Sequence, residues 1–523
     1  MPTTFDAVSL EIAWKRLISI TDQMAATLKR TSFSPLVREG NDFSCLLLGA
    51  DASSAVQSSV SGPSFLGTLP YTVQQMLEQI PKDSLVPGDV LITNDPWIGT
   101  GHLLDVSVVT PVFVGSRIVA FLANAAHMAD IGGVGFSAVA SDVCEEGLLI
   151  PVSHLARGGV ENRDVINFIR HNVRVPDLVL GDLQAQIAAN HTSAQALTEF
   201  LTEADLELAE IITALQDRSE AALRAAIAKV PDGVYTSEIV SDGYDEALRL
   251  CCRITLEGDS LAVDFAGSSP QSPRGINSVF NYTQSYTIYG LKCVLDPDTP
   301  NNAGCARPIR ISAPPGSILN PAWPAPTLAR HMVGNLLPSL VFAALAPVCS
   351  DRIQADSGSS PIWPVRFDGV DNGRPFTLTV QYSGGQGARA TKNGMSAISF
   401  PANASNTPVE VLESIAPLSV LEKRLIDGSG GAGTYVGGMG QRIVIQSLAS
   451  GPLKVSILGQ RLRHPAVGLL GGAPGRSGRI TAGGTRYESN VVVTLAPQAS
   501  IELELPGGGG WGPPAPGSGR NES

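Results

Sequence analysis

The sequence predicts a mixed α+β fold, in which a helical connector joins an α/β amino-terminal half to a β-rich carboxy-terminal half. Apolar residues recur at helical spacing over residues 10–28, which indicates an opening amphipathic helix. Residues 183–230 contain no Gly or Pro, which favours a long helix or a helical hairpin. Beyond about residue 350, short apolar runs alternate with Gly-rich connections, a pattern typical of short strands.

The remaining elements are predicted from short apolar runs bounded by turn-forming residues. In the amino-terminal half these runs predict strands at residues 43–48, 90–93, 106–114 and 118–122. In the second half they predict strands at residues 250–256, 262–265, 376–381, 442–446, 453–458 and 490–495, and candidate helices at residues 277–295 and 327–345.

These elements suggest a division of the chain into units. We expect an α/β domain at residues 1–180, a helical connector at 181–232, a mixed β/α domain at 233–400, a β-rich domain at 401–512 and a disordered tail at 513–523.

Composition excludes several classes of function. The 523 residues include 36 Lys and Arg against 48 Asp and Glu, a net charge of −12, which argues against nucleic acid as the main partner. Seven scattered cysteines without a C-x-x-C pair suggest neither a disulfide framework nor a structural zinc site. The longest uncharged apolar stretch, residues 334–350, is shorter than the roughly 20 residues of a membrane span. With no signal-peptide pattern at its start, we expect a cytoplasmic protein without a membrane partner.

Two histidines flank a predicted hairpin. If residues 106–113 and 116–122 pair around the loop Val114-Gly115, the numbers of paired residues add to 229, and His102 faces His127. Directly opposed Cβ atoms lie about 4.5–5.5 Å apart, close enough for two imidazoles to share one metal ion. The alternative is that each histidine is a turn or capping residue.

Nearby carboxylates strengthen the metal hypothesis. Asp105 would add an oxygen ligand, provided that residues 101–103 lie in the loop before the strand, because strict alternation would turn Asp105 away from His102. Asp95 and Asp130 could orient the imidazoles or act as a general base. The other five histidines lack carboxylates at ligand spacing, and we expect structural roles for them: His154, His171, His191, His331 and His464.

Nucleotide and hydrolase motifs are weak or missing. The run from Gly428 to Gly433 matches G-x-G-x-x-G, but turn and strand patterns follow it where a dinucleotide site needs a helix. The sequence contains neither a P-loop nor a G-x-S-x-G elbow. We therefore expect no ATP site of the P-loop type in this chain.

Several motifs together resemble one known family. Three of them lie near the candidate metal ligands: REGNDFSC (38–45), NDPWIGTGHLLDV (94–106) and AHMADIGG (126–133). Others follow in LDPDTPNNAGCARP (295–308), SGGQGARATKNG (383–394), SNTPVEVLES (405–414), DGSGGAGTYVGGMG (427–440) and GGGGWG (507–512). The chain resembles, over nearly its whole length, the hydantoinase B/oxoprolinase family, which also includes a subunit of acetone carboxylase.

The resemblance implies an ATP-dependent amidohydrolase that opens a small cyclic amide such as a hydantoin, a lactam or oxoproline. In the family a hydantoinase A-like partner binds ATP and phosphorylates the amide oxygen, and the B-type subunit carries a divalent metal (Zn, Mn or Mg). Carried over by position, the ligands are Asp42, His102 and His127, joined by Asp105 in the carboxylase branch. A hetero-oligomer is therefore implied, and spacing alone could not have supplied Asp42.

Two alternatives remain open. The chain could be a subunit of an ATP-dependent ketone carboxylase, although it is shorter than the carboxylase members. It could also be a non-catalytic scaffold for the ATP-binding partner.

Arg389 and Lys392, in a Gly-rich loop, could contact phosphate or a substrate carbonyl, or could belong to a solvated turn.

Overall fold

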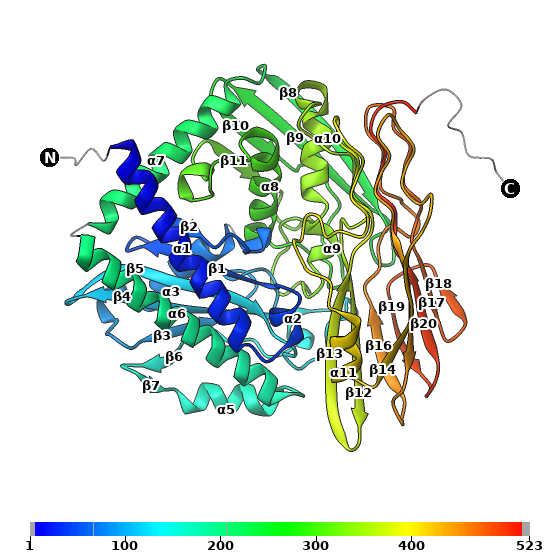
Figure 1. Ribbon diagram of the computed structural model, residues 1–523, viewed down its shortest axis with the longest axis horizontal. Helices are drawn as coiled ribbons and strands as arrows, with labels where there is room; N and C mark the ends of the chain where they lie inside the picture. Colours follow the sequence, from blue (N-terminus) through cyan, green and yellow to red (C-terminus); the bar gives the residue numbers. More distant parts are fainter. Residues whose placement is uncertain (1–5, 66, 205–206, 515–523) are drawn as a thin grey trace.

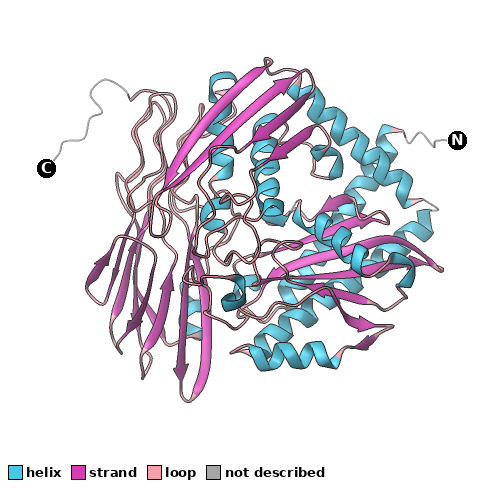
Figure 2. Ribbon diagram, turned by 180° about the vertical axis from the view of Figure 1, so that it is seen from behind, coloured by secondary structure: helices cyan, strands magenta, loops and turns pink. Residues whose placement is uncertain are grey.

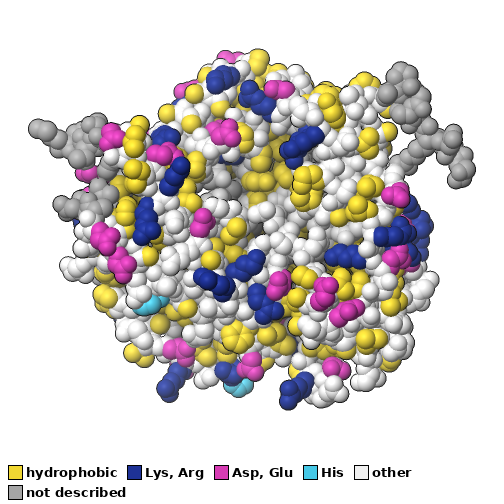
Figure 3. All heavy atoms as spheres, in the orientation of Figure 1, with side chains coloured by type: hydrophobic (Ala, Val, Ile, Leu, Met, Phe, Trp, Pro, Cys, Tyr) yellow, Lys and Arg dark blue, Asp and Glu magenta, His cyan; other side chains and the backbone are white. Residues whose placement is uncertain are grey.

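The computed structural model describes residues 6–65, 67–204 and 207–514 (Figure 1). It confirms the mixed α+β class, with four sheets and helices distributed unevenly among them. Seen from behind in Figure 2, helices surround the sheets of the first two thirds of the chain, whereas the carboxy-terminal strands carry little helix. On the face shown in Figure 3, basic and acidic side chains are interspersed.

The amino-terminal sheet has seven strands in the order β2-β1-β5-β4-β3-β6-β7. Its strands are β1 (Phe43–Gly49), β2 (Ser54–Gln57), β3 (Val90–Thr93), β4 (Asp105–Val114), β5 (Arg117–His127), β6 (Ser153–Arg157) and β7 (Val160–Glu161). All four strands predicted in this half are confirmed. The sheet is central to the site because the first residue of β4 and the last residue of β5 lie side by side at one end of these strands.

Helices bury both faces of this sheet. On one face lie α1 (Ala7–Thr31), α6 (Pro176–Ala204) and α7 (Leu208–Ile227), packed on residues such as Val106 and Val108. On the other face α3 (Thr68–Gln79) packs on Val109. Strand alternation explains the division, since successive side chains point to opposite faces. The smaller helices here are α2 (Pro35–Arg38), α4 (Val143–Glu146) and α5 (Arg163–Asn172).

The segment predicted as a connector is part of this first unit. The structure has two helices there, α6 and α7, and their apolar residues share one core with α1 and the sheet. The Asp6 side chain caps α1 by accepting from the backbone N–H groups of Val8 and Ser9, at 3.0 Å each. The predicted periodicity of α1 is confirmed by its buried residues, among them Leu10, Trp14 and Leu17.

A second sheet, in the order β11-β10-β9-β8, carries the middle of the chain. Its elements are β8 (Gly233–Ser241), β9 (Leu248–Glu257), β10 (Ser260–Asp264), α8 (Phe280–Leu295), β11 (Ile309–Ser312), α9 (His331–Gly334) and α10 (Leu337–Cys349). The helix predicted at residues 327–345 begins later, because residues 327–330 form a turn. By length and composition the segment His331–Cys349 could cross a membrane, but 83% of its window is buried here, as in a core helix.

The carboxy-terminal unit is a β sandwich. One sheet has the order β13-β12-β16-β19 and the other β14-β15-β20-β17-β18, and both contribute to one apolar core. Its elements are β12 (Trp363–Asp371), β13 (Arg374–Tyr382), α11 (Val409–Ile415), β14 (Leu418–Leu425), β15 (Gln441–Ser447), β16 (Leu453–Ile457), β17 (Arg479–Ala482), β18 (Thr485–Tyr487), β19 (Val491–Leu495) and β20 (Ser500–Glu504). The boundary expected at residue 400 therefore falls after two strands that belong to this sandwich.

Gly-rich segments pack directly against one another beside the sandwich. The backbone N–H of Gly508 donates to Gly438 at 3.0 Å, and the N–H of Gly431 donates to Gly508 at 2.8 Å. The G-x-G-x-x-G match at residues 428–433 lies in this packing, and the next regular element is β15, so the helix of a dinucleotide site is missing from the described chain. All seven cysteines are free thiols. Of the tail expected to be disordered, residues 515–523 lie outside the described residues.

The Gly-rich packing predicts a strong effect of a single methyl group. A Cβ at position 508 would lie 2.1 Å from the backbone oxygen of Gln386, so Gly508→Ala should lower the free energy of unfolding by about 2–3 kcal/mol or more. Chemical denaturation measures the change. Gly451→Ala is the matched control, because a Cβ there meets no atom within 4 Å. Equal stability of the two variants would contradict the packing described here.

Candidate metal centre

The hairpin β4–β5 forms, but in a different register from the predicted one. Asp105 pairs with His127, so the paired residue numbers add to 232 and not to 229. Two of the three residues by which the register differs come from the loop, which is Gly115-Ser116 and not Val114-Gly115. Gly115 has φ +61° in the first loop position, as in type II′ turns. The third comes from a bulge between Val112 and Phe113. The prediction that His102 lies directly opposite His127 is therefore wrong.

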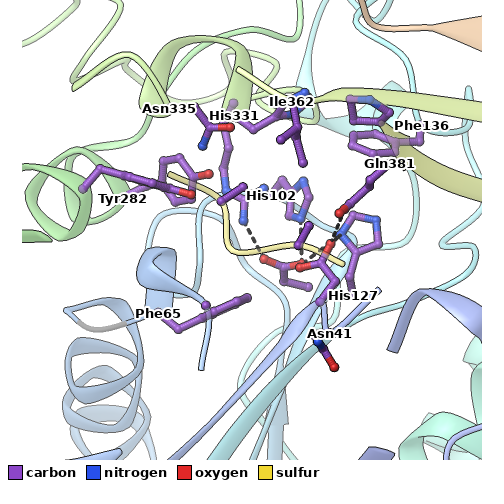
Figure 4. A pocket seen from close by; sticks show the side chains of 18 residues that line it. Asn41, Phe65, His102, His127, Phe136, Tyr282, His331, Asn335, Ile362 and Gln381 are labelled. Atoms are coloured by element: carbon purple, nitrogen blue, oxygen red, sulfur yellow. Dashed lines mark hydrogen bonds and ion pairs between the residues drawn. The ribbon is translucent and has the colours of Figure 1, made fainter. Parts of the chain in front are cut away.

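The two histidines nevertheless meet. Residues 101–104 form a turn before β4, as the metal hypothesis required, and this turn carries the His102 ring to within 5.0 Å of the His127 ring, measured between centroids. Asp105 Oδ1 lies 2.8 Å from His102 Nε2 and 3.2 Å from His127 Nδ1. One carboxylate oxygen thus lies between two imidazoles, and Figure 4 shows His102 and His127 in this pocket.

The surroundings fix the orientation of this triad. His102 Nδ1 lies 2.8 Å from the backbone oxygen of Leu328, an acceptor only, so Nδ1 carries the proton and Nε2 offers a lone pair. The second oxygen of Asp105 accepts from Arg330 Nη2 at 2.5 Å and from Thr100 Oγ1 at 2.9 Å. These contacts leave Oδ1 of Asp105 and Nε2 of His102 directed at the same place.

Electrostatics give His102 and Asp105 the protonation states that metal binding requires. Burial, helped by the positive charge of Arg330, lowers the pKa of His102 to about 4, so its imidazole is neutral near pH 7. Burial opposes ionisation of Asp105, but its close contacts with His102 and with the positively charged Arg330 outweigh burial and hold its pKa well below the usual range. A neutral imidazole therefore faces a carboxylate.

Asp42 lies beside the triad. Its Oδ2 is 3.7 Å from His127 Nδ1 and accepts from Gln381 Nε2, at the end of β13, at 2.8 Å. Burial raises the pKa of Asp42. The preceding residue, Asn41, has a positive φ of 56°, which turns the chain into β1 and brings the carboxylate to the edge where β5 ends. The structure thus brings together all four residues predicted as ligands, with Asp42 at the periphery.

The four residues border a small cavity of about 50 Å³, enough for a few water molecules or a cation with part of its hydration shell. Phe136 packs against both imidazoles, with ring centroids 6.2 Å from His102 and 5.2 Å from His127. The cavity is also lined by Tyr282, Arg330, His331, Asn335 and Gln381 from later parts of the chain. It therefore lies where the three units of the fold meet.

The residues present fit a divalent cation. Ligand atoms of His102, Asp105 and His127 all lie within 4.8 Å of one another, and all three side chains are almost fully buried. Within the described chain, His102 Nε2 and Asp105 Oδ1 make no well-formed hydrogen bond although they are buried. Buried polar atoms without partners are rare in folded proteins. Two imidazoles and a carboxylate are also the donors found in catalytic metal sites.

Comparison with known proteins identifies the family of this chain. The profile of the hydantoinase B/oxoprolinase family matches residues 6–514. The chain belongs to this family. A protein assigned as the B-type subunit of a D-/L-hydantoinase from Pseudomonas sp. (strain NS671) is 32% identical, over 97% of this chain and 90% of its own. The 5-oxoprolinase of Dictyostelium discoideum is 30% identical over 98% of this chain, which spans 40% of that longer protein.

Two solved structures have the same fold. The ATP-dependent caprolactamase from Pseudomonas jessenii superposes with a TM-score of 0.90 at 26% identity, covering 98% of this chain and 92% of that one. An acetone carboxylase structure superposes with a TM-score of 0.87, covering 97% of this chain and 76% of that one, but at 18% identity it shows the fold alone. The family predicted from the motifs is confirmed.

Asp95 and Asp130, predicted as a base or as orienting residues, do not line the cavity. Asp130 is fully buried and pairs with Arg366 at 2.8 Å and with Arg174 at 2.7 Å. Asp95 accepts from the backbone N–H of Trp97 at 2.9 Å and so caps its own turn. Both carboxylates are engaged in holding loops, and neither is placed to take a proton from a water in the cavity.

Other sequence candidates also lie elsewhere, and some residues of the cavity were missed. Lys392 is exposed, Arg389 is half-buried, and neither lines the cavity. His331, for which a structural role was predicted, does line it, as do Arg330 and Asn335. No local pattern could have found these three, because they join the site only through the packing of α9 against the first unit.

A buried glutamate positions the turn that carries these residues. Glu146 Oε1 accepts from the backbone N–H groups of Thr327 at 2.6 Å and of Leu328 at 2.7 Å. Leu328 is the residue whose carbonyl oxygen contacts His102. Burial raises the pKa of Glu146 to about 8, although both backbone donors oppose the shift. Glu146 thus connects the first unit to the turn before α9.

The raised pKa of Glu146 predicts a pH-dependent stability. The pKa of Glu146 is about 8 in the folded chain and 4.5 when it is unperturbed, so between these pH values the folded chain keeps a proton that the unfolded chain releases. The free energy of unfolding therefore falls as pH rises from about 4.5 to about 8. Glu146→Gln keeps an acceptor without the charge, so it should lose less stability than the parent between about pH 5 and pH 8. Thermal unfolding at pH 5 and at pH 8 measures the loss of stability, with Glu145→Gln, at an exposed position, as control. Equal losses in parent and Glu146→Gln would contradict the assignment.

Proposed function

We propose that the chain is the metal-dependent B-type subunit of an ATP-dependent hydrolase of cyclic amides. In this proposal a hydantoinase A-like partner phosphorylates the oxygen of a hydantoin, lactam or 5-oxoproline ring, and the present chain hydrolyses the activated amide. The two chains would form a hetero-oligomer. The seven free cysteines support a reducing compartment, and we propose the cytoplasm.

One observation carries this proposal. The buried group His102, Asp105 and His127 borders a small cavity, and its unpaired nitrogen and oxygen atoms are suited to a cation. Family membership supplies the reaction class, since its relatives include a protein named as the B-type component of a hydantoinase, a 5-oxoprolinase and an ATP-dependent caprolactamase. The sequence has no P-loop, which supports binding of ATP by a partner.

The proposed step is a hydrolysis. The oxygen of a water molecule adds to the ring carbonyl carbon, the ring carbon–nitrogen bond breaks, and the nitrogen takes up a proton. This cleavage leaves an acyl phosphate, and a second water molecule hydrolyses it to a carboxylate and inorganic phosphate. Phosphorylation beforehand matters because an unstrained amide is a poor electrophile.

The residues of the cavity have separate tasks in this step. Asp42, His102, Asp105 and His127 would hold the divalent ion, which when bound lowers the pKa of water and polarises a carbonyl group. Among Zn, Mn and Mg, two imidazole donors favour Zn over Mg. Gln381 orients Asp42, and the packing of Phe136 keeps bulk water from the imidazoles.

Arg330 adds positive charge next to the cavity. Its guanidinium pairs with Asp105, donates to the backbone oxygen of Thr100 at 2.7 Å and lies 4.2 Å from the centroid of the Tyr282 ring. In the low dielectric of a buried site such a charge stabilises negative charge that develops on the reacting group. We assign Arg330 this electrostatic task in addition to holding Asp105.

Loss of a ligand should remove both the metal and the activity. His102→Ala and His127→Ala are each expected to lower bound metal at least about tenfold and to abolish ATP-dependent ring opening by the complex, without unfolding the chain. Elemental analysis and circular dichroism check occupancy and fold, and His191→Ala, at an exposed position on α6, is the control. Full activity without stoichiometric metal would favour a scaffold in place of a hydrolytic component.

ATP use should depend on the partner. The chain alone is expected to hydrolyse ATP no faster than a buffer blank, whereas the complex with a hydantoinase A-like partner releases phosphate in proportion to ring opening. Phosphate release and product are measured in parallel on hydantoin, 5-oxoproline and lactams. Robust ATP hydrolysis by the isolated chain would contradict this division of labour. If the complex opens none of these rings but carboxylates acetone when acetone is supplied, the ketone carboxylase alternative is established.

A further inference from the structure

We propose that Asn335 recognises the amide group of the ring, by pairing its carboxamide with the ring nitrogen and the adjacent oxygen, and that it thereby selects cis amides. This inference rests on the proposed function. It gives a role to the side of the cavity formed by α9, which holds none of the proposed metal ligands.

Asn335 and His331 on this side of the cavity, together with Gln381 of β13, form a wall whose hydrogen-bonding atoms lack partners within the described residues. Both Nδ2 and Oδ1 of Asn335 are buried and make no hydrogen bond within the described part of the chain, and the same holds for Nε2 of His331 and Oε1 of Gln381. Asn335 is 1% exposed and His331 and Gln381 are 7% exposed. An unmade hydrogen bond in a buried site is unfavourable, so four such atoms around one cavity point to a ligand that satisfies them.

The position of Asn335 is fixed by its backbone. Its N–H donates to the carbonyl oxygen of His331 at 3.1 Å, and its own carbonyl oxygen accepts from the Ser360 hydroxyl. His331 begins α9 and Asn335 follows its last residue, so one helical turn joins them, and Figure 4 shows them together on one side of the pocket. The backbone of Asn335 is thus held, while its carboxamide makes no hydrogen bond within the described residues.

The wall is placed next to the metal triad. Phe136 lies between them, with its ring centroid 5.7 Å from His331 and 5.2 Å from His127. Gln381 contacts Asp42 through Nε2, and its Oε1 is unpaired within the described residues. A small molecule in the cavity can thus contact Asn335 while its carbonyl carbon lies near the imidazoles.

The chemistry of a carboxamide matches the edge of a ring amide. Asn carries a donor and an acceptor on one planar group. A small ring forces its amide into the cis form, so that the N–H and the C=O lie on the same edge and can make two parallel hydrogen bonds with Asn335. When phosphorylation of the oxygen is accompanied by loss of the N–H proton to solvent, the ring nitrogen becomes an acceptor, and Nδ2 can donate to it. The carboxamide therefore suits the ring before and after activation.

The same geometry disfavours ordinary peptides. An acyclic secondary amide is trans, with its N–H and C=O on opposite sides, and its cis form lies about 2.5–4 kcal/mol higher. Such an amide can satisfy only one of the two polar atoms of Asn335. Asn335 would thus be a specificity residue of the site.

The test uses the reconstituted complex at saturating ATP, with 2-pyrrolidinone and ε-caprolactam as probes beside their N-methyl derivatives, which lack the N–H. Hydantoin and 5-oxoproline are included as further rings. The variants are Asn335→Leu, which keeps the volume and removes both polar atoms, and Asn335→Asp, which keeps the shape and replaces the donor. Asn372→Asp, at an exposed position in the β12–β13 turn, is the matched control. Metal content and thermal unfolding are measured on every variant.

We expect the parent to prefer N–H rings over N-methyl rings by at least about tenfold in kcat/KM. Asn335→Leu and Asn335→Asp should lower kcat/KM for N–H rings about 10- to 100-fold, with metal content unchanged, and should change the values for N-methyl rings less than about threefold. The preference would then collapse. Such a collapse distinguishes recognition of the amide from a general loss of structure, which would lower both values alike.

Three outcomes would overturn the inference. One is a parent complex without preference for N–H rings, which needs no variant to fold. A second is an equal loss on both classes of ring in the Asn335 variants, and a third is unchanged kinetics relative to Asn372→Asp. A parent complex that carries metal but opens none of the rings would instead refute the proposed function, and with it this inference.

Discussion

The buried ion pair between Asp105 and Arg330 holds the centre in one arrangement. Asp105 begins β4 in the first unit, and Arg330 precedes α9 in the second. With one oxygen held by Arg330, the other is free to face both imidazoles. Removing either partner of such a pair leaves an uncompensated buried charge, which costs about 3–5 kcal/mol. The pair therefore sets both the geometry of the site and the way in which the two units join.

The ion pair in turn depends on one residue of the preceding turn. Gly101 has φ +98°, and a Cβ there would lie 2.6 Å from Cδ of Arg330. Only glycine combines this backbone conformation with the close approach of the arginine. On the other side, Glu146 holds the turn that presents Leu328 and Arg330. Local backbone requirements on both units thus converge on one charge pair.

The sequence was informative where the signal is local and silent where it depends on packing. Apolar runs predict four of the seven strands of the amino-terminal sheet and miss β2, β6 and β7. The Gly-rich turn before β4 places His102 near Asp105 and His127 even though the predicted pairing is wrong. The predicted register is wrong for two reasons: the bulge after Val112 has no strong local signature, and the loop is expected one residue too early, although Gly in the first of two loop positions is typical of a type II′ turn. Asp42 came only from family resemblance, since a long stretch of chain separates it from the histidines. Asn335 and His331 had no signal, because they reach the cavity only through the fold.

The unpaired polar atoms of the cavity also bear on the distribution of stability. Several buried groups near the triad are unsatisfied within the described chain, an arrangement that weakens a fold unless the surrounding structure is rigid. Rigidity is supplied nearby: the Gly-rich segments that follow β13 are joined to one another by backbone hydrogen bonds, and β13 ends at Gln381 and Tyr382. The dense packing of glycine backbones thus fixes the end of the strand that orients Asp42. The carboxy-terminal sandwich contributes to the centre through this constraint, whereas the four candidate ligands come from the first unit.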